Sequence, residues 1–65
     1  MTKELLERLP QTVVNKLNEC NKDYNNMALN KASVRSRNAG YVLGLRDAGL
    51  ITERERQILF IYTTI

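Results

Sequence analysis

The chain has 65 residues, with ten Lys or Arg, seven Asp or Glu, and no histidine or tryptophan. A chain this short has one small core, so we expect residues 1–65 to form a single domain. The lack of histidine excludes His-containing zinc sites and His-based catalytic triads. Cys20 is the only cysteine and cannot form an intramolecular disulfide, which favours a reducing, cytoplasmic location.

The first two predicted helices meet at Pro10. Three leucines within residues 3–9 predict a short leading helix, and Pro10 fits the first turn of the next helix while disfavouring helical geometry at Leu9. We therefore expect a kink here. The apolar stripe of the second helix has 4-3-4-3 spacing and consists of Val13, Leu17, Cys20, Tyr24 and Met27. Six asparagines lower the helix propensity of this segment, so we expect the helix to end between residues 25 and 31.

The third predicted helix covers residues 31–48 and carries two overlapping patterns. Its apolar face consists of Val34, Tyr41, Leu45 and Ala48. A row of small residues, one every four positions, consists of Ala32, Ser36, Gly40, Gly44 and Ala48. Glycine inside a helix costs about 1 kcal/mol relative to alanine, and close approach of another helix would offset that cost. We therefore predict that Gly40 and Gly44 lie at a close helix–helix contact within the chain.

The fourth predicted helix has the clearest boundaries. Gly49 is placed to end the third helix in a left-handed conformation, and Thr52 with Glu55 three residues later forms a capping box. These signals predict a helix over residues 53–63. Residues 58–65 also have high strand propensity, so a C-terminal strand is the alternative, but the capping box favours a helix.

These elements predict an all-α fold, a small three-helix bundle with a short kinked N-terminal helical segment. The N-terminus has an acidic residue, Glu4, and no apolar stretch, which is unlike a signal peptide. The longest apolar run is residues 58–62, far shorter than the roughly 20 residues of a membrane span. We therefore expect a soluble protein that takes neither a membrane nor a metal as partner.

The net charge of +3 lies in the middle of the chain. The candidate contacts for an anion or a nucleic acid are Lys31, Arg35, Arg37 and Arg46, opposed there only by Asp47. A local excess of positive charge attracts phosphate backbones or acidic protein surfaces. The alternative interpretation is a solvated helix face.

The fourth helix is apolar around most of its circumference, so its apolar residues cannot all lie on one buried face. Ile58, Leu59 and Tyr62 share a face, whereas the candidate interface residues Phe60, Ile61 and Ile65 lie off it. Apolar side chains that a small core cannot cover indicate a binding surface. We therefore expect a protein partner or a homo-oligomer.

Catalysis is not expected. Glu53 and Glu55 point to different faces of their helix, and Cys20 lies in an apolar stripe, where a core role is more common than a nucleophilic one. The sequence predicts neither a cofactor nor a metal.

Residues 37–64 resemble small uncharacterised proteins encoded on phages and conjugative elements of low-GC Gram-positive bacteria. The resemblance implies a role in regulating the element or in contacting the host, in which binding is more common than catalysis. The expected function is a small non-enzymatic regulatory or adaptor protein that binds another protein. A small basic nucleic-acid-binding helical protein is the alternative.

Overall fold

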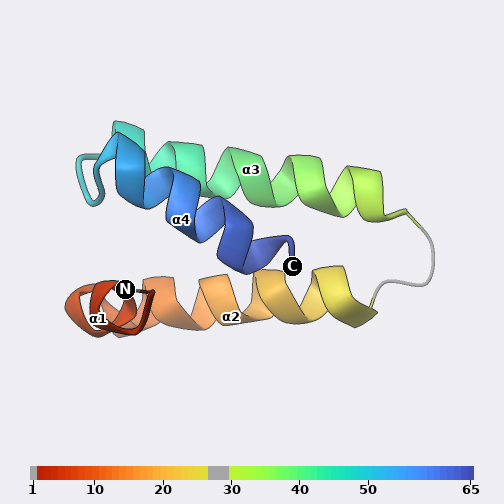
Figure 1. The fold of residues 1–65 in the computed structure, drawn as a ribbon, viewed down its shortest axis with the longest axis horizontal. Helices are drawn as coiled ribbons and strands as arrows, with labels where there is room; N and C mark the ends of the chain where they lie inside the picture. Colours follow the sequence, from red (N-terminus) through yellow and green to blue (C-terminus); the bar gives the residue numbers. More distant parts are fainter. Residues whose placement is uncertain (1, 27–29) are drawn as a thin grey trace.

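The computed structural model describes residues 2–26 and 30–65, which form four helices. These are α1 (Thr2–Arg8), α2 (Gln11–Asn26), α3 (Lys31–Asp47) and α4 (Glu53–Thr63). In Figure 1, α2 and α3 lie side by side and run in opposite directions, and α4 crosses them obliquely. The all-α prediction is confirmed, since the described residues contain no strand.

The predicted three-helix bundle matches this arrangement only roughly. The N-terminal segment is a separate helix, α1, which ends at Arg8 before the break at Leu9 and Pro10 and contacts α4. The prediction that α2 ends between residues 25 and 31 is consistent with its described end at Asn26. Met27, the last residue of the predicted stripe, lies outside the described residues.

Local sequence signals set the start of each later helix. The Pro10 carbonyl accepts the first two backbone hydrogen bonds of α2, from Val13 and Val14, each at 3.0 Å. The side chain of Asn30 caps α3 by accepting from the Ser33 N–H at 3.1 Å. Each of these contacts satisfies a backbone group that the first turn of a helix leaves without an internal partner.

The connection between α3 and α4 forms as predicted. Gly49 has a φ of 80°, its N–H bonds the Arg46 carbonyl, and the next N–H, of Leu50, bonds the Leu45 carbonyl. This pair of bonds is a Schellman motif, which requires a left-handed residue at the Gly49 position. Thr52 and Glu55 then form the reciprocal capping box that begins α4.

The core lies where the helices meet. Leu17 of α2, Val42 of α3 and Leu59 of α4 are fully buried. The other buried members of this cluster are Leu5, Leu9, Leu45 and Ile51. Because α1 and the α3–α4 loop both supply core residues, each element of the chain contributes to the same core.

A polar side chain, Asn38, lies fully buried between the three long helices. Its amide nitrogen donates to the carbonyl oxygens of Cys20 at 3.1 Å and Thr63 at 2.9 Å. Its amide oxygen accepts from Arg37 at 3.2 Å. Asn38 on α3 therefore joins the backbones of α2 and α4 by hydrogen bonds.

The buried face of α3 differs from the predicted one. It consists of Val34, Asn38, Val42 and Leu45. Tyr41 is half-buried and Ala48, predicted on this face, is exposed. At about 100° per residue, the row of small residues is centred on the side of α3 opposite this buried face.

The predicted close contact at Gly40 and Gly44 is wrong. Both residues are exposed, and a Cβ atom added to either would meet no atom within 4 Å outside its own stretch of helix. Among the described residues, therefore, no helix packs against them, and their low helix propensity is not offset by a close approach.

Candidate functional site

Two of the four candidate cations are held in ion pairs. Arg37 bonds Asp23 of α2 at 2.9 Å, and Arg46 bonds Glu53 of α4 at 2.6 Å and its neighbour Asp47 at 3.1 Å. The positive charge of these two arginines is therefore partly neutralised by adjacent carboxylates.

The other two candidate cations lie over aromatic rings. The Lys31 ammonium lies 4.7 Å from the centre of the Tyr24 ring, and the Arg35 guanidinium lies 5.4 Å from the centre of the Phe60 ring. The structure thus places the four residues against different partners on α2, α3 and α4. It does not bring them together into one cationic site.

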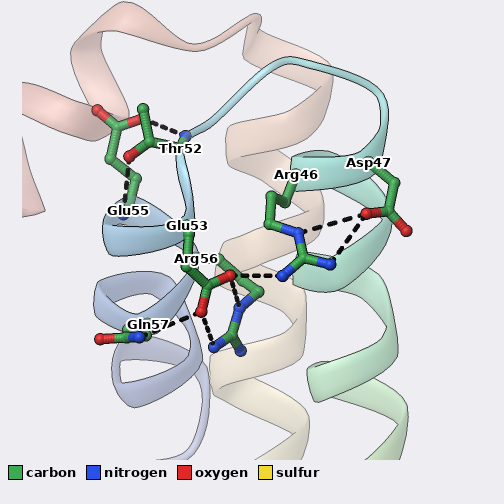
Figure 2. A network of polar contacts seen from close by, with 7 residues as sticks. All are labelled: Arg46, Asp47, Thr52, Glu53, Glu55, Arg56 and Gln57. Atoms are coloured by element: carbon green, nitrogen blue, oxygen red, sulfur yellow. Dashed lines mark hydrogen bonds and ion pairs between the residues drawn. The ribbon is translucent and has the colours of Figure 1, made fainter.

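Glu53 is the centre of a polar network at the start of α4, shown in Figure 2. Its carboxylate accepts from Arg56 at 2.7 and 2.8 Å, from Arg46 at 2.6 Å and from Gln57 at 3.1 Å. Arg56, then Arg46 and Gln57, hold the pKa of the Glu53 carboxyl far below its usual range. Since Arg46 belongs to α3, the network joins the end of α3 to the start of α4.

Glu55 joins the start of α4 to α1, as Glu53 joins it to α3. Its carboxylate accepts from the Thr52 backbone N–H at 2.9 Å and from the Arg8 guanidinium. The Thr52 N–H, and after it Arg8, lower the pKa of the Glu55 carboxyl. The two glutamates are therefore structural contacts between helices, which is consistent with their placement on different faces of α4.

The outer face of α4 is the side opposite buried Leu59 and Thr63, and we define it by the exposed residues Arg54, Gln57 and Ile61 together with Ile65. Ile61 is 58% exposed, and Ile65, beyond the C-cap, is 75% exposed. In the described chain these are the most exposed large hydrophobic side chains. Contiguous apolar residues on a surface are typical of binding sites.

The third predicted interface residue, Phe60, lies differently. Phe60 is partly buried, packs against the core and is covered on one side by Arg35. It forms the edge of the outer face towards α3, and its ring contributes to the fold. Of the three candidate interface residues, only Ile61 and Ile65 are mainly exposed.

Arg54 is a member of the outer face that the sequence analysis did not identify. It is exposed and forms no ion pair among the described residues. It precedes Ile61 by seven residues, which is two turns of helix on the same side. The spacing Arg54–Ile61 was visible in the sequence, but recognising it required knowing that Leu59 and Thr63 mark the buried side.

An open groove of about 700 Å³ lies between α1 and α2. Its apolar lining comes from Leu6, Leu9 and Val14, and Tyr62 of α4 also lines it. The Tyr62 hydroxyl bonds Asn18 of α2. The apolar side chains of the lining are also members of the core or packed against it, so the groove follows from the way α1 lies on the other helices.

Cys20 is 1% exposed, and burial raises the pKa of its thiol. Both properties fit a small core residue, because a reactive cysteine needs access and a lowered pKa. Among the described residues, no cluster of His, Cys, Asp and Glu could hold a metal ion. Across the same part of the chain, no helix combines the length and apolar character that crossing a membrane requires.

Comparisons of the chain with protein-family models, curated proteins and solved structures give no match.

Proposed function

We propose that this chain is a small non-enzymatic regulatory or adaptor protein that binds another protein through the outer face of α4. The observation that carries the proposal is the exposure of Ile61, at 58%, on a helix whose opposite side is fully buried, and of Ile65, at 75%, just beyond the end of that helix. The mobile-element origin implied by the resemblance of residues 37–64 is part of this proposal and accounts for a role in binding.

Burial of these side chains by a partner would be favourable. Transfer of an isoleucine side chain from water into an apolar interface contributes roughly 1.5–3 kcal/mol when burial is complete. A rigid helix already held by the core also loses little conformational entropy on binding. The outer face of α4 is therefore a preformed surface.

The nucleic-acid alternative has less support. Arg37 and Arg46 already contact carboxylates, and Lys31 and Arg35 lie over rings on two different helices. A phosphate backbone needs cations that are free and aligned. No observation on the described residues favours this function over protein binding.

Site-specific photo-crosslinking tests the proposal. A photoreactive amino acid is placed at Ile61 in cells of the source organism, with Ser36, an exposed residue on the far side of α3, as the matched control position. We expect a discrete covalent adduct from position 61 and none from position 36. No adduct from position 61, or the same adducts from both positions, would contradict the proposal.

A further inference from the structure

We infer that the partner of the outer face of α4 is an amphipathic helix with acidic residues beside its apolar stripe. This inference rests on the proposed function and names the chemistry of the partner. It is carried by two features of that face, the apolar side chains Ile61 and Ile65 and the cations that border them.

The charges left without a partner in the described chain are mainly positive. The carboxylates that form ion pairs with the chain's own Lys or Arg are Glu19, Asp23, Asp47, Glu53 and Glu55. In contrast, Arg54 has no carboxylate partner in the part of the chain described, and Arg35 contacts only the face of a ring.

These two cations lie at the borders of the apolar surface. Arg54 is two turns before Ile61 on the same side of α4, and Arg35 reaches the α3 edge of this surface over Phe60. The carboxylates nearest to Arg54 in sequence, Glu53 and Glu55, already accept from other groups. A partner with acidic flanks would therefore meet unpaired positive charge on two sides of the isoleucines.

The size of the surface favours a helix over a second copy of the chain. A stable dimer needs roughly 800 Å² from each subunit. That area is about a fifth of the whole surface of this protein, which is 4287 Å². The two exposed isoleucines are confined to α4, an 11-residue helix, and the two residues that follow it. A single helix with anchors spaced three or four residues apart suits a surface of this extent.

The test uses two labelled synthetic helical peptides with the same leucine stripe, one flanked by glutamates and the other by lysines. Fluorescence anisotropy measures their binding to the full chain at low salt. We expect the acidic peptide to bind at least about fivefold more tightly, the order expected for two exposed charge pairs. This difference should shrink at high salt.

Three variants locate the effect. Arg35→Gln with Arg54→Gln should give both peptides similar affinities, whereas Lys22→Gln, which removes an exposed cation of α2, should leave the difference intact. Ile61→Glu should weaken binding of the acidic peptide at least about tenfold, because the variant loses an apolar contact and adds a charge that repels the peptide. Circular dichroism checks that each variant keeps its helical spectrum.

Other outcomes would overturn the inference. Equal affinities for the two peptides would contradict the acidic preference while leaving protein binding at α4 in place. Binding of neither peptide, with self-association in sedimentation that Ile61→Glu abolishes, would make a second copy the partner. Binding to anionic phosphatidylglycerol vesicles in place of the peptides would make a lipid surface the partner. The crosslinking experiment at position 61 decides the proposed function separately.

Discussion

Asparagine side chains complete the hydrogen bonding at the end of α4. The last carbonyl oxygens of a helix have no partner within it. Asn21 donates to the Tyr62 carbonyl at 2.7 Å and Asn38 to the Thr63 carbonyl at 2.9 Å. The Phe60 carbonyl accepts from the hydroxyls of Thr63 and Thr64. The Ile61 carbonyl accepts from the Thr64 backbone N–H. An unpaired buried carbonyl would be costly, so these bonds hold the helix end in the core.

Asn38→Ala should destabilise the fold by about 2–4 kcal/mol, because it leaves the buried Thr63 carbonyl oxygen without its donor, removes a second hydrogen bond from the Cys20 carbonyl and creates a cavity. The measurement is urea unfolding followed by circular dichroism. Asn25→Ala is the control, since Asn25 is exposed and bonds only the Asn21 carbonyl of its own helix. An Asn38→Ala variant as stable as the control would show that the buried amide contributes little.

The glycines of α3 lead to the opposite expectation. Gly40→Ala and Gly44→Ala should each stabilise the protein by about 0.5–1 kcal/mol, because alanine has the higher helix propensity and the added methyl group meets open space. Gly49→Ala should instead destabilise by about 1–2 kcal/mol, since its φ of 80° is left-handed. A loss of stability at Gly40 or Gly44 in thermal melts would indicate a contact that the structure does not show.

At the scale of the element, α4 is fixed at both ends and along one side. Glu53 and Glu55 join its start to α3 and α1, Asn38 joins its end to α3, and Leu59 occupies the core. Because these contacts lie on the inner side or at the ends, the outer face remains free. The same helix therefore stabilises the fold and presents a surface.

The ion pairs at the start of α4 predict acid sensitivity. The pKa values of Glu53 and Glu55 are lower in the folded chain than their ordinary value of 4.5. A carboxyl whose folded pKa is lowered contributes stability above its unfolded pKa, and this contribution is lost as the pH falls through the folded value. We therefore expect the melting temperature to fall as the pH drops from about 5 towards 2.

Substitution of both glutamates separates this effect from general acid unfolding. A Glu53→Gln, Glu55→Gln variant should melt lower than the wild type at pH 7, and its melting temperature should depend less on pH below 5. The melting temperatures are measured by scanning calorimetry. If the melting temperature depends on pH equally steeply in the two proteins, other carboxyls control the acid response.

The boundaries of α4 could be predicted from sequence because their causes are local. Gly49, Thr52 and Glu55 lie within seven residues and make their contacts with one another or with adjacent turns. The role of Asn38 could not be predicted, because its two acceptors are 18 and 25 residues away. Asparagine usually lowers helix propensity, so the six asparagines predicted only the end of the second helix, whereas one of them, Asn21, donates to the Tyr62 carbonyl of α4.

The candidate site was predicted only in part, because some of its contacts also join different helices. Excess apolar residues around residues 53–63 indicated a surface, and Ile61 and Ile65 are indeed exposed. Phe60 was expected beside them, but its flank of α4 faces α3, which a helical wheel alone cannot show. Likewise, Arg37 and Arg46 were counted as free cations, although Asp23 of α2 and Glu53 of α4 pair with them.

At the scale of the whole molecule, we expect charge pairing to limit nucleic-acid binding. Lys31, Arg35 and Arg46 fall on one side of α3 at about 100° per residue, and three phosphate contacts from them would give a salt slope of about −3. Since Arg46 is paired and Arg35 covers a ring, we expect weak binding of a labelled DNA duplex at low salt and a shallower slope. A slope of −3 or steeper in fluorescence polarisation, lost in an Arg35→Glu, Arg46→Glu variant, would favour the nucleic-acid function instead.

The central claim is that α4 has one side in the core and the other free for a partner, and urea unfolding of an Ile61→Gln variant tests it most directly. Ile61 is 58% exposed, and Leu59, two residues earlier, is fully buried. Ile61→Gln should change the free energy of unfolding by less than about 0.5 kcal/mol, whereas Leu59→Ala should cost about 2–5 kcal/mol. A loss of more than about 1 kcal/mol in Ile61→Gln would contradict the account, because it would show that the chain itself covers this face.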